Sequence, residues 1–221
     1  MAQQPKIPLQ QKIRESYIEY ILMNGRRPES IYSFAKELKI AEETFYEEFN
    51  SFVQVENDIW KSFVVQTIVA IEADEVYATY SVREKLLSFY YTLIEMMKKQ
   101  RSYVLKSYER MDTPLRMKKN IQMSDAKLVF EDFVNELLLE GRETREVEQR
   151  PIPQLMQRYP DMLWKQALSI IDFWVNDMSK SFEKTDTLIE KSVNTSMDLL
   201  GRTPLDSVFD LGKFLYQNRK Q

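Results

Sequence analysis

The chain has 221 residues, of which 43% are hydrophobic and 29% are charged, and its formal net charge is −3. It contains no cysteine and no histidine, which excludes disulfides and thiolate chemistry and removes the usual general base and the commonest metal ligand. Its four glycines offer little material for tight β-turns, whereas its abundant Glu, Lys, Leu, Met and Arg favour helices. We therefore expect an all-α protein with no metal, no cofactor and no enzymatic activity.

Neither a leader sequence nor a membrane span is indicated by the apolar pattern. Residues 1–8 are polar, contain two prolines and lack the apolar core of a signal peptide. The longest apolar stretch, residues 63–71, is interrupted by Gln66 and is too short to cross a bilayer. We expect a cytoplasmic protein, and the negative net charge means that any nucleic-acid site must be local.

Apolar residues recur at helical spacing between clear start and stop signals. Gly25, Gly141 and Gly201 each follow such a run and are interpreted as left-handed C-terminal caps. Ser81 followed by Glu84 is typical of a capping box at a helix start. The predicted helices cover residues 10–24, 29–38, 42–48, 54–78, 82–99, 101–111, 115–140, 155–179, 183–200 and 204–218.

The first three predicted helices are short and the others are mostly long, which predicts a small head at residues 1–52 and a larger helical body at residues 53–221. Within the head, the order is helix, loop, helix, short turn, helix. A three-helix unit of this kind is typical of a helix-turn-helix, which lays its third helix across a major groove. Its apolar positions are Ile31, Phe34, Ala35, Leu38, Phe45 and Phe49.

In its spacing of key residues, the head resembles that of the TetR family of transcriptional regulators. The matching positions are Gly25, Ser30, Ile31, Phe34, Ala35, Thr44, Phe45, Tyr46 and Phe49. The resemblance implies a helix-turn-helix DNA-binding domain joined to a helical body that binds a ligand and forms a homodimer.

The resemblance also implies which residues contact double-stranded DNA. Ser30 would cap the second helix and offer its hydroxyl to a phosphate, and Thr44 and Tyr46 would donate to phosphates from the third helix. Lys36 and Lys39 would add positive charge. The full DNA-binding set is Ser30, Lys36, Lys39, Glu42, Thr44 and Tyr46.

Three features depart from the family's pattern. Lys39 occupies the turn position where the family usually has glycine, so the turn forms at some strain. Phe52 replaces a lysine that touches a phosphate. The head carries seven Lys and Arg against eight Glu, a net charge of −1, whereas phosphate neutralisation supplies most non-specific affinity for DNA. Four of the acids lie around the third helix: Glu42, Glu43, Glu47 and Glu48.

Large rings and methionines in the body favour a pocket for a small apolar or aromatic effector. For any single one of these side chains, ordinary helical core is the favoured explanation, and the pocket itself is expected from the resemblance to the family. The candidate ligand-binding residues are Phe89, Tyr90, Met97, Trp164, Phe173 and Trp174.

The helices predicted at 155–179 and 183–200 occupy the place where TetR-like proteins pair into dimers. Each carries an apolar stripe that could serve a homodimer or pack inside one subunit, and two half-sites on DNA favour the homodimer. The stripes are Ile170, Ile171, Trp174 and Met178, and Leu188, Ile189, Val193, Met197 and Leu200. Residues 101–120 are locally basic and are interpreted as a solvated face, with an anionic ligand or a lipid surface as the alternative.

Two functions follow from this pattern. The first is a ligand-responsive transcriptional regulator that binds DNA. The alternative is a TetR-fold protein that binds an apolar or lipid-like ligand and has lost DNA binding, as the acidic head would allow.

Overall fold

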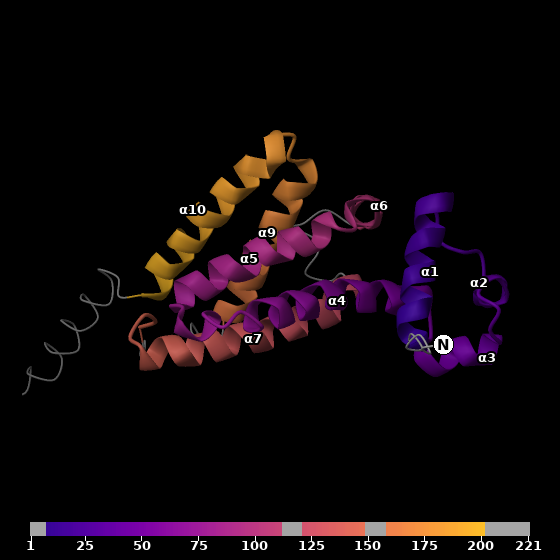
Figure 1. The fold of residues 1–221 in the computed structure, drawn as a ribbon, viewed down its shortest axis with the longest axis horizontal. Coiled ribbons are helices and arrows are strands. Elements are labelled where there is room, and N and C mark those ends of the chain that lie inside the picture. The colour runs from indigo at the N-terminus through magenta and orange to yellow at the C-terminus, as the bar shows by residue number, and fades with distance from the viewer. Residues whose placement is uncertain (1–7, 112–120, 149–157, 202–221) are drawn as a thin grey trace, which may run out of the picture. The chain divides into compact units, whose positions relative to one another are not determined.

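The computed structural model describes residues 8–111, 121–148 and 158–201, and every regular element among them is helical (Figure 1). The all-α prediction is therefore confirmed. The α-helices are α1 (Leu9–Asn24), α2 (Ile31–Glu37), α3 (Glu42–Glu48), α4 (Phe52–Glu72), α5 (Val82–Lys98), α6 (Arg101–Glu109), α7 (Ser124–Glu143), α9 (Tyr159–Asn176) and α10 (Glu183–Leu200). Single 3-10 turns are η1 (Tyr77–Thr79), η3 (Ile121–Met123) and η4 (Lys180–Phe182). The helix predicted at 204–218 and the starts of those predicted at 115 and 155 lie outside the described residues.

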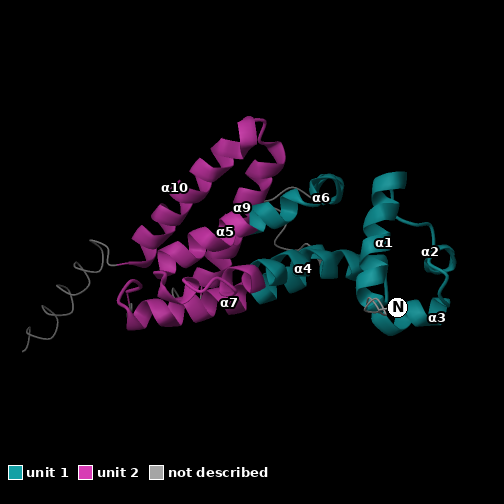
Figure 2. Cartoon of the chain, viewed as in Figure 1, with its two compact units in different colours: residues 1–67, 93–129 teal, residues 68–92, 130–221 magenta. Residues whose placement is uncertain are grey.

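The described chain divides into two compact units (Figure 2). Unit 1 comprises residues 1–67 and 93–129, and unit 2 comprises residues 68–92 and 130–221. The first unit contains the three short helices of the predicted head together with α6, which contacts α1. The division of the chain at residues 52 and 53 stays a prediction.

Helix α1 buries one stripe, Ile13, Tyr17 and Ile21, whose spacing of four residues places them on one face. It ends at Gly25, whose φ of 67° lies in the left-handed region and whose N–H donates to the Ile21 carbonyl at 2.8 Å. The left-handed cap predicted there is confirmed.

The other two glycines differ from the prediction. Gly141 does not end a helix but lies buried inside α7, where an added Cβ would meet Val147 Cγ2 at 2.5 Å and Val82 Cγ2 at 3.1 Å. Glycine is required there because two other segments approach the helix backbone closely. Gly201 does follow α10, but its φ of −74° and ψ of −174° are extended rather than left-handed.

Helix α4 ends at Glu72, six residues before the end of the helix predicted at 54–78. The side chain of Asp74 accepts a hydrogen bond from the Val76 N–H at 3.2 Å, an Asx-turn that offers the backbone an alternative to the helix. The last residues of the predicted segment instead form the separate turn η1.

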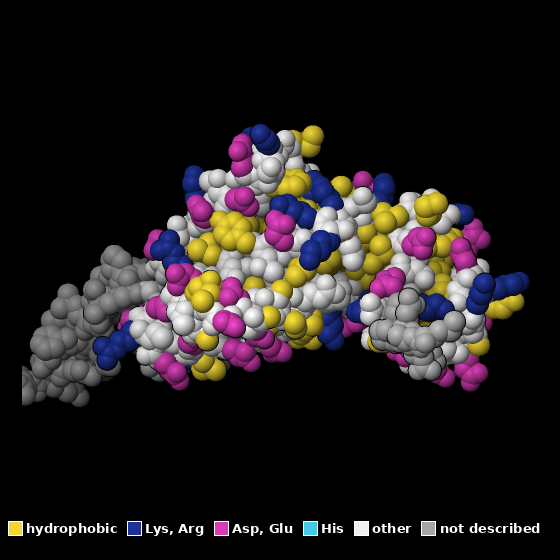
Figure 3. Space-filling model, in the orientation of Figure 1, with side chains coloured by type: hydrophobic (Ala, Val, Ile, Leu, Met, Phe, Trp, Pro, Cys, Tyr) yellow, Lys and Arg dark blue, Asp and Glu magenta, His cyan; other side chains and the backbone are white. Residues whose placement is uncertain are grey.

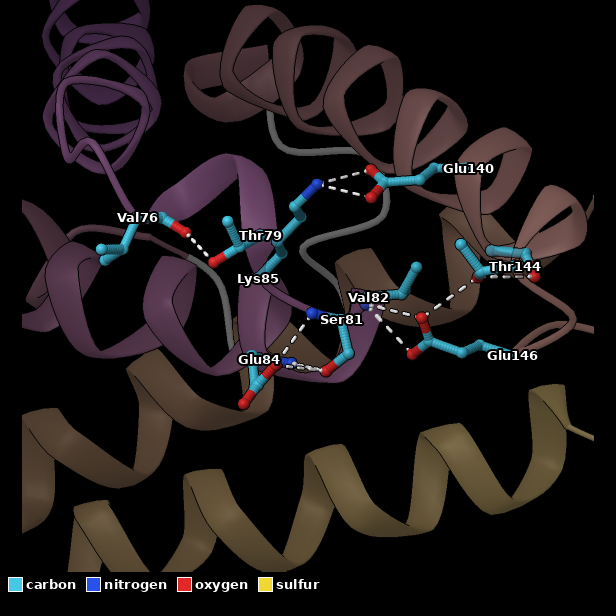
Figure 4. A network of polar contacts seen from close by, with 10 residues as sticks. Val76, Thr79, Ser81, Val82, Glu84, Lys85, Glu140, Thr144 and Glu146 are labelled. Atoms are coloured by element: carbon cyan, nitrogen blue, oxygen red, sulfur yellow. Dashed lines mark hydrogen bonds and ion pairs between the residues drawn. The ribbon is translucent and has the colours of Figure 1, made fainter.

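The start of α5 shows the predicted capping box (Figure 4). The Ser81 N–H donates to Glu84 Oε2 at 2.8 Å, and the Glu84 N–H donates to Ser81 Oγ at 3.3 Å. In the same view, the buried Lys85 ammonium reaches both oxygens of Glu140 on α7 at 2.6 Å. Local capping and one long-range ion pair therefore fix the first turns of α5 within unit 2.

Helices α9 and α10 contact each other, and most of the two predicted stripes lies inside the subunit. Buried positions include Ile170, Ile171, Trp174, Ile189, Val193 and Leu200, whereas Met178 is 95% exposed. Of the two uses considered for these stripes, packing inside one subunit therefore accounts for most of their residues. Asp177 ends α9 and accepts hydrogen bonds from Ser179 N at 2.8 Å and from Thr185 Oγ1 at 2.7 Å.

Candidate nucleic-acid interface

The turn between α2 and α3 closes without glycine. Lys39 takes a φ of 57°, and its N–H donates to the Lys36 carbonyl at 3.1 Å. The Ile40 N–H donates to the Ala35 carbonyl at 3.0 Å. This pair of bonds is a Schellman motif with lysine at the left-handed position, so the strain predicted for Lys39 is present in the structure.

Side chains at both ends of α2 support the turn. Ser30 caps the helix, as predicted, by accepting a hydrogen bond from the Ser33 N–H at 3.1 Å. At the other end, the Lys12 ammonium on α1 donates to the Leu38 carbonyl at 3.2 Å. Helix α2 is therefore held at its start by its own cap and at its end by α1.

A cluster of rings holds the three helices together. Phe34 of α2 is 1% exposed and packs edge-on against Tyr17 of α1 and Phe45 of α3, with ring centroids 6.1 and 6.2 Å apart. Phe52, the first residue of α4, stacks on Tyr17 and also contacts Phe34 and Phe45. The departure at Phe52 is thus explained, because this half-buried side chain packs against the ring cluster of the head.

The six predicted DNA-contacting residues lie on α2, on its flanking residues and on α3. Lys36, Lys39 and Glu42 are exposed, Tyr46 is 46% exposed, and Thr44 is half-buried. Their contact with DNA stays a prediction. The sequence analysis did not single out Tyr32. This residue of α2 belongs to the same helix-turn-helix segment and is 60% exposed.

The charge of the surface formed by α2 and α3 is unusual for a DNA-binding surface. Glu42, Glu43, Glu47 and Glu48 are all exposed, and none forms an ion pair within the described chain. The first two lie in the first turn of α3, where the helix dipole stabilises a negative charge. The two acids of the first turn therefore stabilise the helix locally. All four acids reduce the attraction of this surface to phosphates.

A buried carboxylate on α4 contacts the first helix of the head and the loop that follows it. Glu56 of α4 is 0% exposed and accepts hydrogen bonds from Tyr17 Oη at 2.6 Å, Arg27 Nε at 2.9 Å and Gln122 Nε2 at 2.6 Å. A second nitrogen of Arg27 forms a short ion pair with Glu56 Oε2, and Arg110 Nη2 lies 3.4 Å from Oε1. Although desolvation opposes the shift, the hydrogen bonds from Arg27 and Tyr17 keep the pKa of Glu56 below its ordinary value.

The sequence analysis missed this cluster. In the sequence, the only local signal of the cluster is Glu56 itself, an acid that follows Val55 near the start of α4. Arg110 also differs from the interpretation of residues 101–120 as a solvated face, because its guanidinium turns inward to Glu56. The basic positions 116, 118 and 119 of that segment lie outside the described residues.

Three of the candidate effector-binding residues meet in unit 2. Phe89 stacks on Phe133 with centroids 5.0 Å apart, and Phe130 contacts both Phe89 and Trp164, at 5.2 and 5.5 Å. The Tyr90 hydroxyl donates to a backbone carbonyl, that of Leu163, at 3.2 Å.

The other three candidates are not part of that ring cluster. Trp174 packs on Phe182. Along α9, Trp174 lies about 15 Å from Trp164, at a rise of about 1.5 Å per residue. Phe173 is 39% exposed, and Met97 belongs to unit 1. An effector site at these residues stays a prediction.

Two hollows are lined by other residues. One of about 560 Å³ lies in the head between α1 and α2, against Tyr20, Phe34 and Glu37. The other, about 410 Å³, is a groove along α9 and α10 lined by Met162, Gln166, Leu188, Lys191, Ser192, Thr195, Ser196 and Leu199.

Among the described residues, no three acidic, histidine or cysteine side chains gather to hold a metal ion. On the face shown in Figure 3, acidic, basic and apolar side chains are interspersed.

Comparisons with known proteins place the body in a family. A family model described as tetracyclin repressor-like, C-terminal domain, matches residues 85–215. A search of curated protein sequences returns no significant match. In the described chain, no helix combines the length and the apolar character that a membrane crossing needs.

Solved structures share the fold at low identity. A protein assigned to the TetR family of transcriptional regulators from Syntrophomonas wolfei is 14% identical, with a TM-score of 0.64, over 85% of this chain and 94% of that one. The fatty acid degradation regulator FadR from Bacillus halodurans is 16% identical, with a TM-score of 0.60, over 86% of this chain and 96% of its own. A third, from Shewanella sp. PV-4 and also assigned to the TetR family, is 14% identical with a TM-score of 0.54, over 83% and 96% of the two chains.

Proposed function

The chain belongs to the TetR family of transcriptional regulators, and on that premise we propose that it binds double-stranded DNA as a homodimer and that a small apolar or aromatic effector changes its DNA affinity. The observation that carries the DNA-binding role is the turn between α2 and α3, whose complete Schellman motif persists although lysine occupies the left-handed position. A DNA-binding role also implies a cytoplasmic location, and no catalytic role is proposed.

The DNA contacts are proposed for the exposed residues of α2 and α3. The hydroxyl of Tyr46 and the ammonium groups of Lys36 and Lys39 would reach phosphates, while Glu42 at the start of α3 would accept from a cytosine amino group. Because few phosphates are neutralised, the dependence of affinity on salt should be shallow for a protein of this class.

Fluorescence anisotropy on 40-base-pair fragments tiled across the region upstream of the gene tests this role. We expect at least one fragment to bind more tightly than its scrambled counterpart, and Tyr46→Phe to weaken that binding. Tyr80→Phe is the control, because it removes a hydroxyl from a tyrosine in unit 2. Equal affinity for native and scrambled fragments at low salt would rule out sequence-specific DNA binding.

The homodimer is proposed to form through the outer face of α9 and α10. The groove there is flanked by Met162, Leu188 and Leu199, and Leu199 is 50% exposed. The small polar side chains of Ser192 and Ser196 beside it would allow a second pair of helices to approach closely.

Sedimentation of the Leu199→Glu variant tests this face. We expect the variant to sediment as a monomer, since a buried unpaired carboxylate is costly. Leu139→Glu on α7 is the control, because Leu139 is 57% exposed on another helix. A Leu199→Glu dimer as stable as the wild type would exclude this interface.

The acidic surface of α3 favours a second candidate function, a binding protein for an apolar or lipid-like ligand without DNA binding. Its support is the four exposed glutamates around α3, which form no ion pair among the described residues. Native mass spectrometry of the purified chain distinguishes the two, because a co-purified lipid-like molecule combined with no DNA discrimination would favour this candidate.

A further inference from the structure

The hollow of about 560 Å³ between α1 and α2 has an apolar floor. Phe34 and Leu38 of α2 form this floor and are 1% and 8% exposed. The ring of the half-buried Tyr20 on α1 meets the ring of Phe34 edge-on, with centroids 6.1 Å apart and 85° between the planes. Sites for small organic molecules have volumes of roughly 300–1,000 Å³, so the hollow is large enough to hold one.

Two carboxylates line the same hollow without a cation to balance them. Glu19 on α1 and Glu37 on α2 are both exposed, and neither forms an ion pair or a side-chain hydrogen bond within the described chain. Lys12, the one basic residue of the lining, donates its ammonium to the Leu38 carbonyl at 3.2 Å. With two glutamates against one lysine, the lining has a net charge of −1 and attracts a positive charge.

The chemistry of the lining selects the class of ligand. A hard metal ion needs more oxygen ligands than two carboxylates supply, and aromatic rings offer it none. A neutral apolar molecule would remove water from the carboxylates without replacing its hydrogen bonds. An ammonium group on an apolar or aromatic body satisfies both parts of the lining, because it donates to carboxylates and is attracted to ring faces.

We propose that the hollow between α1 and α2 is a binding site for a small organic cation. The ammonium group binds beside Glu19 and Glu37, and the body of the molecule packs against Tyr20 and Phe34. Met23, which is 80% exposed, has a flexible side chain that can pack over the bound molecule. None of the candidate effector-binding residues lines this hollow, and the site does not depend on the proposed DNA binding.

Isothermal titration calorimetry on the full chain tests the ligand class with three probes that share one body. The probes are phenylbutylamine, which is a cation at neutral pH, phenylbutanol, which is neutral, and phenylbutyrate, which is an anion. We expect the amine to bind with a Kd about tenfold below that of the alcohol, and the butyrate to bind most weakly. Binding of the amine should weaken as salt is added, because both carboxylates are exposed.

Charge-removing variants test the location. Glu19→Gln and Glu37→Gln keep the shape of each side chain, and each should raise the Kd of the amine about threefold, with about tenfold in the double variant. Glu47→Gln on α3 is the matched control. It makes the same change in the net charge of the head at an exposed glutamate that does not line the hollow.

Four results would overturn the proposal. An unchanged Kd in the double variant would place the amine elsewhere, such as in the body. An equal loss in Glu47→Gln would mean general attraction to an acidic head. An alcohol or a butyrate that binds as tightly as the amine would exclude selection of a cation. A Kd that rises with protein concentration would mean that a second copy of the chain fills the hollow.

Discussion

The ring of Phe52 stacks on the ring of Tyr17, with centroids 5.5 Å apart and 22° between the ring planes. This contact joins the first residue of α4 to the buried face of α1. Phe52→Ala should therefore lower the free energy of unfolding by about 2 kcal/mol, since the ring is only partly buried. Urea unfolding followed by circular dichroism measures it. Phe173→Ala, at a ring that is 39% exposed, should cost clearly less, and equal losses would contradict the role of Phe52 in the head.

The left-handed turn residue predicts a stabilising substitution. Lys39→Gly should raise the free energy of unfolding by roughly 0.5 kcal/mol, because relief of the left-handed strain exceeds the added freedom of the unfolded chain. Lys36→Gly should instead lower it by about 1 kcal/mol, because Lys36 lies in the helical last turn of α2. Opposite shifts of the thermal midpoint in the two variants would confirm this, and a fall in both would refute it.

The two glycines Gly25 and Gly141 predict losses of different origin. Gly141→Ala should cost about 2 kcal/mol or more, because its methyl group would overlap Val147 and press on Val82. Gly25→Ala meets no atom within 4 Å, so only its φ of 67° opposes the change and the loss should be about 1 kcal/mol. Chemical denaturation of both variants gives the comparison, and a larger loss at Gly25 would contradict the close approach at α7.

Asp177 predicts a pH dependence at the junction of α9 and α10. Although desolvation opposes the shift, hydrogen bonds from Ser179 and Thr185 lower the pKa of Asp177 to about 2. A carboxylate with a lowered pKa stabilises the fold fully above its ordinary pKa, and the contribution disappears as the pH falls toward the lowered value. The stabilisation should therefore be complete at pH 5 and above and be lost between about pH 4 and pH 2.

Thermal unfolding at several pH values tests this prediction with Asp177→Asn. At pH 6 the variant should be less stable than the wild type by about 1–2 kcal/mol, because an amide cannot accept on both sides. The difference should shrink as the pH falls toward 2. Asp198→Asn, at an exposed position of α10, should show no such convergence. A difference that is constant from pH 6 to pH 2.5 would refute the assignment.

The sequence by itself determined the features that depend on neighbours a few residues apart. The capping box of Ser81 and Glu84, the left-handed residue at Gly25 and the bounds of α3 and α10 followed from local spacing, because helix periodicity and caps are local properties. The spacing of the head was also sufficient to identify the family resemblance that the match over residues 85–215 later confirmed.

Tertiary structure alone decided the roles of residues whose partners are distant in the chain. Gly141 resembled a helix cap until Val82 was found against it, and Arg110 resembled a solvated charge until it was found at Glu56, 54 residues away. Phe52 replaced an expected lysine for a reason visible only beside Tyr17. Spacing along a helix reports which residues share a face, but it carries no information about what that face meets. Long-range packing and buried ion pairs are therefore set by the fold.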